Sequence, residues 1–148
     1  MISRNQALGR WGETLITKRY ACPRCKRHRT LRRLPTNFKC ADIICDFCGY
    51  LAQVKTVTVR DVSKPPRAVL GAAWKPQEAR MKAGIYFPLF LVLRSRNKSS
   101  AYYLATEFQE AKAFRRRNPL SKAAKRAGWQ GFVYDLAALR EGALVRIL

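Results

Sequence analysis

Two pairs of cysteines constrain the fold of this chain more than any other feature of its sequence. Cys22 and Cys25 form one C-x-x-C pair, Cys45 and Cys48 form the second, and the nineteen residues 26–44 separate the two pairs. Two residues between paired cysteines let both sulfurs reach one metal from a tight turn, and four thiolates complete tetrahedral zinc without an open position. The spacing therefore predicts a structural zinc knuckle formed by residues 22–25 and 45–48, in preference to four independent thiols or a redox motif.

The other cysteine features agree with a metal site. The total of five is odd, and no apolar segment that resembles a signal peptide follows Met1, so a disulfide framework is not expected. Gly49 directly follows Cys48 and suits the left-handed turn that a knuckle requires. Cys40 is the fifth cysteine, and we expect it to be a buried strand residue rather than a ligand.

Length and composition favour one domain that covers residues 1–148. The chain is 48% hydrophobic, which is enough for a packed core. We expect an α/β (α+β) fold with a mixed central sheet about five strands wide, flanked by helices. The expected helices cover 5–20, 77–82, 106–116 and a basic turn at 121–128. The expected strands cover 38–44, 50–59, 87–94, 101–104, 132–135 and 144–148, with a basic connector at 29–33 and a loop at 60–76.

The charge of the chain points to a polyanionic partner. The sequence contains 30 Lys and Arg against 9 Asp and Glu, a formal net charge of +21, which is far more than solubility requires. Nucleic acid is the first candidate, because Lys and Arg neutralise phosphates. No apolar run approaches the ~20 residues that span a bilayer, and an anionic membrane surface is a weaker alternative. We expect a cytoplasmic, DNA-associated protein.

Two basic surfaces are candidates for contact with nucleic acid. Arginines clamp phosphate in a bidentate manner, lysines act as point charges, and an aromatic ring can stack on a base. Trp129 could instead pack in the core. The candidate DNA-binding residues are Arg115, Arg116, Arg117, Lys122, Lys125, Arg126 and Trp129, with Lys64 and Arg67 as a second surface.

Three polar residues next to the knuckle form a candidate catalytic site. Asp42 precedes Cys45 on an expected strand, while Gln53 and Lys55 alternate on the next strand and therefore share a face. A carboxylate and an amide oxygen are hard ligands for Mg²⁺ or Mn²⁺, and a lysine can orient water or stabilise developing negative charge. The trio suits phosphodiester hydrolysis, although the same spacing also arises from solvated strand residues.

Two segments resemble the catalytic domain of DpnI-type restriction endonucleases, which belong to the PD-(D/E)XK nuclease superfamily. Residues 41–48 (ADIICDFC), followed by 53–55 (QVK), resemble the catalytic hairpin with its inserted second cysteine pair. Residues 117–131 (RNPLSKAAKRAGWQG), followed by Asp135 and Leu136, resemble a second family segment. With Cys22 and Cys25 the resemblance covers about residues 20–147. It implies a metal-dependent endonuclease that acts on double-stranded DNA at adenine-methylated GATC sites.

Three departures or ambiguities accompany the resemblance. The family has an acid where this chain has Gln53, which removes one formal negative charge from the metal site. The family's enzymes also carry a winged-helix domain that these 148 residues do not include. Glu13 is a candidate additional metal ligand on the first helix, but its place beside the apolar stripe of Leu8, Trp11 and Leu15 predicts an exposed side chain.

Three functions therefore compete. A metal-dependent DNA endonuclease is the leading hypothesis. A nuclease-like DNA-binding module that no longer cuts is favoured by Gln53 alone. An RNA-binding zinc-ribbon protein accounts equally well for the charge and for the cysteines, but not for the two segments that resemble the nuclease family.

Overall fold

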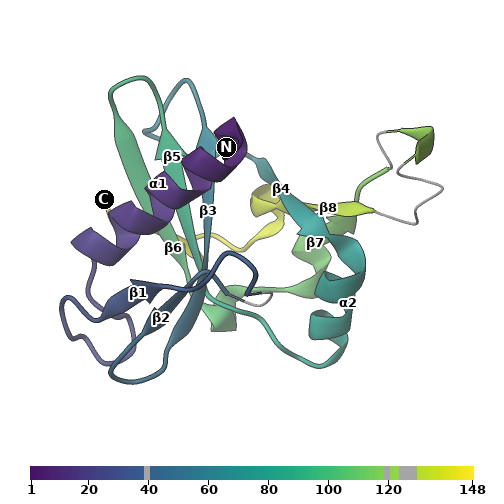
Figure 1. Ribbon diagram of the computed structural model, residues 1–148. Coiled ribbons are helices and arrows are strands. Elements are labelled where there is room, and N and C mark those ends of the chain that lie inside the picture. Colours follow the sequence, from purple (N-terminus) through teal and green to yellow (C-terminus); the bar gives the residue numbers. More distant parts are fainter. Residues whose placement is uncertain (39–40, 119–120, 124–129) are drawn as a thin grey trace.

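The computed structural model describes residues 1–38, 41–118, 121–123 and 130–148 (Figure 1). The helices are α1 (Arg4–Arg19) and α2 (Trp74–Lys82). The strands are β1 (Leu31–Arg33), β2 (Ile43–Cys45), β3 (Leu51–Thr58), β4 (Ala68–Ala73), β5 (Leu89–Arg94), β6 (Ser99–Leu104), β7 (Phe114–Arg116), β8 (Gly131–Asp135) and β9 (Leu144–Arg146). Short 3₁₀ turns cover Thr106–Phe108, Ala111–Ala113 and Leu136–Ala138.

The central sheet contains six strands in the order β1-β2-β3-β5-β6-β9. Strands β3 and β5 are parallel, and the other neighbouring pairs are antiparallel, which confirms the expected mixed α+β fold. Gln53 lies opposite Leu89, and Lys55 lies opposite Leu91. Strand β3, which carries Gln53 and Lys55, is therefore hydrogen-bonded to β2 on one side and to β5 on the other.

Strand β5 joins two hydrophobic cores, because successive strand residues point to opposite faces. Leu89, Leu91 and Leu93 belong to one cluster, whereas Phe90 and Val92 belong to the other. This double burial explains the continuous apolar run at Leu89–Leu93, since a strand covered on both faces has no polar side. One face carries α1 and the cysteine knuckle, and the other face packs against a second sheet.

Helix α1 lies closely against β3. The helix begins at a capping box, in which the Ser3 side chain accepts from Gln6 N and the Gln6 side chain accepts from Ser3 N. Its buried residues are Gly12 and Ile16. A Cβ atom at Gly12 would lie 1.8 Å from Thr56 Oγ1, so the glycine permits this close approach of helix and strand.

A second sheet, which the sequence did not predict, contains three strands in the order β4-β8-β7. Strand β4 and helix α2 both lie in the connection between the parallel strands β3 and β5, and β4 falls in the region expected to be a loop. Its pairing with β8 comes from a distant part of the chain, so no local pattern could reveal it. Figure 1 shows this sheet and α2 standing beside the central sheet.

The expected helix at 106–116 is wrong. Thr106 donates its hydroxyl to Tyr86 O at 2.8 Å, and Gln109 Nε2 donates to Phe87 O at 2.6 Å, so both polar side chains bind another segment. Phe114 begins β7 and stacks on Tyr134 of β8, with 4.2 Å between ring centroids. Tertiary contacts thus replace the helix with two 3₁₀ turns and a strand.

Other boundaries also differ from the expectation. The connector expected at 29–33 contains β1, and the strand expected at 38–44 is formed only from Ile43 onward in the described residues. Helix α2 begins at Trp74, three residues earlier than expected. Cys40 and most of the turn expected at 121–128 lie outside the described residues.

Candidate active site and metal centre

The four cysteines of the two C-x-x-C pairs converge on one point. Their sulfur atoms all lie within 4.8 Å of one another. The Cys22–Cys48 sulfur distance is 3.6 Å, and the Cys25–Cys45 distance is 3.8 Å. Tetrahedral zinc with Zn–S bonds of about 2.3 Å requires sulfurs roughly 3.8 Å apart. The sulfurs therefore fit a zinc ion, and four protein ligands would leave it no open position for catalysis.

The two knuckle turns use the same backbone conformation after the second cysteine. Gly49 has φ +77°, as the sequence predicted, and Gly49 N donates to Cys45 O at 2.9 Å. Lys26, which follows Cys25, has φ +64° without being a glycine. Its N–H donates to Cys22 O at 2.9 Å. The first turn thus places a side chain in the left-handed region, which favours glycine.

The surroundings of Cys45 favour the thiolate that zinc requires. Burial acts to raise the pKa of this thiol, but hydrogen bonds from Thr30, Cys48 and Phe47 outweigh burial and lower the pKa to about 6. Thr30 Oγ1 lies 3.2 Å from Cys45 Sγ, and Cys48 N lies 3.5 Å from it. A lowered thiol pKa helps metal binding because protons compete with zinc for the sulfur.

The knuckle and the candidate catalytic trio share one hairpin. Strand β2 ends at Cys45 and pairs with β3, which carries Gln53 and Lys55. Asp42 precedes β2, and its backbone N–H donates to Ala52 O at 3.0 Å. This pairing sets the carboxylate beside the strand that carries the amide and the lysine, so the geometry expected from the sequence is present.

Asp42 and Lys55 influence one another across this hairpin. Asp42 Oδ2 accepts a hydrogen bond from Val54 N at 2.8 Å. Burial raises the pKa of Asp42, while the Val54 hydrogen bond and the charge of Lys55 act to lower it. Burial lowers the pKa of Lys55, while the charge of Asp42 acts to raise it. Both groups are thus incompletely hydrated, which is common among residues that bind a metal or a substrate.

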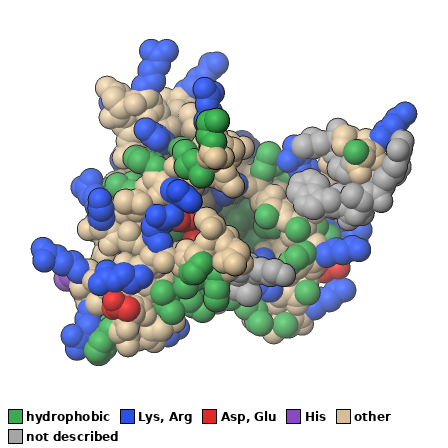
Figure 2. Space-filling view, in the orientation of Figure 1, with side chains coloured by type: hydrophobic (Ala, Val, Ile, Leu, Met, Phe, Trp, Pro, Cys, Tyr) green, Lys and Arg blue, Asp and Glu red, His purple; other side chains and the backbone are tan. Residues whose placement is uncertain are grey.

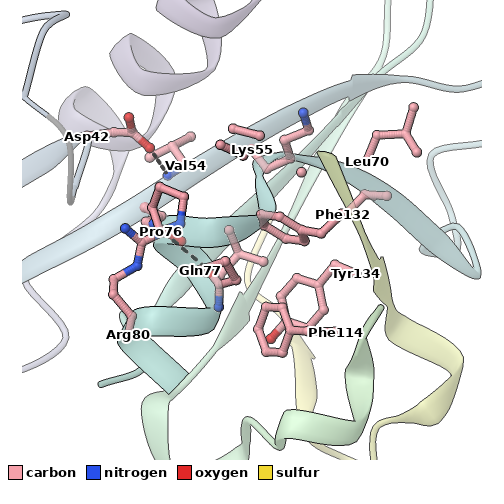
Figure 3. A pocket seen from close by; sticks show the side chains of 16 residues that line it. Asp42, Val54, Lys55, Leu70, Pro76, Gln77, Arg80, Phe114, Phe132 and Tyr134 are labelled. Carbon is pink, nitrogen blue, oxygen red and sulfur yellow. Dashed lines mark hydrogen bonds between the residues drawn. The ribbon is translucent and has the colours of Figure 1, made fainter. Parts of the chain in front are cut away.

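The trio opens onto one cavity of about 430 Å³ between the two sheets. Figure 2 shows a hollow on this face with hydrophobic side chains at its bottom and Lys and Arg side chains around it. In Figure 3, Asp42 and Lys55 lie along β3 on one side, and Phe132, Tyr134 and Phe114 lie across the space from them. The remaining lining comes from Gln53 and Val54 of β3, from Leu89 at the start of β5, and from β4 and α2: Val69, Leu70, Gly71, Ala72, Ala73, Pro76, Gln77 and Arg80.

The expected exposure of Glu13 is wrong. Its side chain is only 17% exposed, and its Oε2 lies 3.1 Å from Arg33 Nε. Burial is the main cause that raises its pKa; the Arg33 hydrogen bond opposes this effect and the charge of Asp42 adds to it. Because Gly12 draws α1 onto β3, the neighbouring Glu13 side chain faces β1 and the Asp42 region rather than solvent.

The candidate DNA-binding residues occupy several surfaces. Arg115 and Arg116 are exposed strand residues of β7, and they contact different acids: Asp135 at 3.5 Å and Glu78 at 4.0 Å. Arg117 is half-buried, and Lys122 is exposed. Lys64 and Arg67 are exposed and do not line the cavity. Lys125, Arg126 and Trp129 lie outside the described residues.

Two polar residues of α2 were missed by reasoning from the sequence. Gln77 is only 5% exposed, and its Oε1 accepts a hydrogen bond from Arg80 Nη2 at 3.1 Å. Both side chains line the cavity (Figure 3). Their i, i+3 spacing was visible in the sequence, but nothing local indicated that this face of the helix meets Asp42 and Lys55.

The comparisons with known proteins place the chain in a family. None of the helices in the described part of the chain has the length and apolar character needed to cross a bilayer. No curated protein matches the chain. The family model described as "DpnI: Dam-replacing family" matches residues 2–148, which is essentially the whole sequence. The hairpin, the cysteine cluster and this match agree, and the chain is a member of the DpnI, Dam-replacing family.

Proposed function

We propose that this protein is a metal-dependent DNA endonuclease that hydrolyses phosphodiester bonds. The observation that carries the proposal is the convergence of Asp42, Gln53 and Lys55 on one cavity, with Asp42 and Lys55 close enough for each charge to act on the other's pKa. Membership of a restriction-type nuclease family supports the same reaction. The charge of +21 supports a polyanionic substrate.

Each residue of the trio has a defined task in this proposal. Asp42 and Gln53 offer the hard oxygen atoms that Mg²⁺ or Mn²⁺ prefers, and Glu13 is the nearby candidate for a further ligand. A bound divalent cation would supply charge neutralisation at the phosphate and a more acidic water. Lys55 orients the attacking water or stabilises the negative charge that develops on the phosphate.

The cysteine centre has a structural task. Zinc held by four sulfurs has no open position, so it would fix the β2–β3 hairpin that carries the trio. The substrate that the family suggests is double-stranded DNA with adenine-methylated GATC sites, cut inside the cytoplasm by a type II restriction-like enzyme. Arg115, Arg116, Arg117 and Lys122 are candidate phosphate contacts among the described residues.

A cleavage assay tests the proposal. The zinc-loaded protein is incubated with Mg²⁺ or Mn²⁺ and with plasmid DNA that has, or lacks, adenine methylation at GATC. We expect cutting by the unmodified protein and a loss of at least ~100-fold in Lys55→Ala, because Lys55 serves the chemical step. Lys98→Ala removes the same charge from the exposed β5–β6 turn and serves as the matched control. Equal rates in Lys55→Ala and Lys98→Ala would contradict the assignment.

Gln53 favours a second candidate, a nuclease-like module that binds DNA without cutting it. An amide lacks the negative charge that attracts a cation, so Gln53→Glu is the variant that separates the two candidates. Retained DNA binding without cutting in the unmodified protein, together with cutting in Gln53→Glu, would establish the non-cleaving module. If both proteins cut, we expect Gln53→Glu to need at least ~10-fold less Mg²⁺.

The choice of nucleic acid needs its own measurement. An RNA-binding zinc protein would bind structured RNA at least as tightly as duplex DNA at the same salt concentration. A DNA endonuclease of this family is expected to prefer the duplex DNA. Competition between matched DNA and RNA hairpins at about 150 mM salt decides between them, since salt suppresses the nonspecific charge attraction common to both.

A further inference from the structure

The cavity beside the trio is larger and more apolar than phosphate hydrolysis requires. A phosphate is held by charged and hydrogen-bonding groups, and Asp42, Gln53, Lys55 and Arg80 supply them. The opposite part of the lining consists of aromatic and aliphatic side chains, and its one hydroxyl, that of Tyr134, already donates to Gln109 Oε1 at 3.0 Å. These side chains are Val69, Leu70, Leu89, Phe114, Phe132 and Tyr134. A volume of about 430 Å³ lies in the range of pockets that enclose a small organic ligand.

The Phe132 ring is held in place at the wall of this cavity. A Cβ atom at Gly71 would lie 2.2 Å from Phe132 Cε2 and Cζ, so the ring rests on strand backbone that only glycine leaves clear. Trp74 and Phe114 contact it from other sides, with ring centroids at 6.5 Å and 5.8 Å. Phe132 is nevertheless only partly buried and lines the cavity (Figure 3), which leaves part of a fixed aromatic surface open to a ligand.

A buried amide lies at the same cavity. Gln77 is 5% exposed, and Arg80 Nη2 fixes its Oε1 at 3.1 Å. A glutamine amide carries two N–H donors besides its oxygen. Proteins that extract a nucleobase from a duplex hold it between aromatic or apolar side chains and bind its edge with a few polar groups. Phe132 and Gln77 are groups of these two kinds in one cavity.

We propose that this cavity binds a nucleobase of the DNA, unstacked from its neighbours, next to the phosphate that Asp42 and Lys55 engage. The inference rests on the proposed function, because the cavity adjoins the trio. It adds a second part of the DNA substrate, a base, to the phosphate that the trio engages. The phosphate lies beside Asp42 and Lys55, the base lies against Phe132, and Gln77, which Arg80 holds, contacts its edge. The sugar connects the two ends.

Mononucleotides test this inference without any cleavage. The zinc-loaded full-length protein is titrated in Mg²⁺ with each of the four deoxynucleoside 5′-monophosphates and, separately, with 2-deoxyribose 5-phosphate, and binding is measured by calorimetry. The two kinds of ligand share the phosphate and the sugar and differ in the base. We expect at least one nucleotide to bind about tenfold more tightly than the sugar phosphate, which is the gain that stacking on an aromatic ring provides.

Three variants locate the effect. Ala72→Trp places a large ring in the cavity from an exposed position and removes the preference for the nucleotide. Ala68→Trp is the matched control, because Ala68 is exposed on the same strand and does not line the cavity. Phe132→Leu keeps an apolar side chain but removes the ring, and we expect it to lose most of the tenfold preference. Thermal unfolding and zinc content confirm that each variant is folded.

The outcomes separate this inference from the proposed function. Equal affinity for the sugar phosphate and all four nucleotides overturns the base site, even if plasmid DNA is cut and Lys55→Ala abolishes cutting. A preference that survives in both Ala72→Trp and Phe132→Leu overturns it as well. A preference lost in those variants but retained in Ala68→Trp supports it, even if the unmodified protein never cuts DNA.

Discussion

At the scale of single residues, Asp42 and Lys55 are costly to bury and are retained at the wall of the cavity. Burial raises the pKa of Asp42 and lowers the pKa of Lys55, so the fold favours the neutral form of each group. The partial compensation comes from their mutual attraction and from the Val54 N–H. A charged residue kept under such conditions indicates a requirement other than stability.

Asp42→Asn should stabilise the protein while it abolishes cleavage. The amide oxygen can still accept the Val54 hydrogen bond, and the ionised carboxylate is no longer placed in a partly buried position. We expect a gain of about 0.5–2 kcal/mol in the free energy of unfolding at pH 7.

The same variant has a defined pH dependence. Because the folded-state pKa of Asp42 is raised, its contribution to stability is fully present below the ordinary value of 3.8 and is lost as the pH rises through the folded-state pKa. The advantage of Asp42→Asn should therefore be largest near neutrality and disappear at about pH 2.5, where the carboxyl group is protonated in both states. Urea unfolding of both proteins across this pH range measures the difference in their free energies of unfolding. A difference that is constant with pH would contradict the prediction.

The glycine of the second knuckle turn makes a separate prediction. Gly49 has φ +77° and open space around its Cα, so an added methyl group there meets backbone strain and no clash. Gly49→Ala should cost about 1–2 kcal/mol of stability. Gly9→Ala, in helix α1 with nothing within 4 Å, is the control and should gain about 0.5–1 kcal/mol. Chemical denaturation of the zinc-loaded proteins compares them, and equal effects would show that the turn is not under strain.

At the scale of secondary-structure elements, the sequence was informative where the signals were local. The period of α1, the β-branched residues of β3 and the spacing of the cysteines all depend on neighbours a few residues apart. The structure has α1 at Arg4–Arg19 and β3 at Leu51–Thr58, close to the expected 5–20 and 50–59. The shared face of Gln53 and Lys55 followed from strand alternation, and the structure places both residues on β3 at the edge of one cavity.

The elements that were missed depend on contacts between distant segments. Strand β4 exists because β8 pairs with it, and β7 exists because Phe114 packs on Tyr134 instead of continuing a helix. The same limit applies to the site. A helical wheel shows Glu13 beside the apolar stripe, but it cannot show that β1 and its Arg33 cover that position.

Zinc should stabilise one half of the molecule more than the other. Cys22 and Cys45 belong to the same buried cluster as Ile16 of α1 and Leu31 of β1, whereas β7 and β8 pack in the other cluster. Removal of the metal by a chelator should lower the thermal midpoint and release hydrogen-exchange protection first in α1, β1 and β2. Exchange measured by mass spectrometry checks this order, and a uniform loss across both sheets would contradict it.

At the scale of the whole molecule, charge governs how the protein meets its substrate. Lys and Arg side chains cover much of the face around the hollow, and few acidic groups interrupt them (Figure 2). This arrangement attracts any duplex DNA, so affinity by itself reveals little about sequence preference. We therefore predict that discrimination comes from the groups inside the hollow rather than from the surrounding charge.

DNA affinity should depend strongly on salt. If the complex involves six or more phosphate contacts, the dissociation constant should rise at least ~1,000-fold between 50 and 200 mM salt, because binding releases condensed counterions. Fluorescence anisotropy with a duplex of fixed sequence measures the slope. A change of less than tenfold would mean that most of the excess positive charge does not touch the DNA.

The connection between the parallel strands β3 and β5 has a consequence for how such proteins diversify. It carries β4 and α2, and these contribute about half of the side chains around the cavity, while the metal-binding hairpin precedes it in the chain. If both proposals hold, half of the base-binding wall and the catalytic trio are encoded by separate stretches of the gene. Randomising codons 68–79 in the laboratory would vary one wall of the cavity and leave Asp42, Gln53, Lys55 and Arg80 unaltered, which makes this crossover a target for directed evolution.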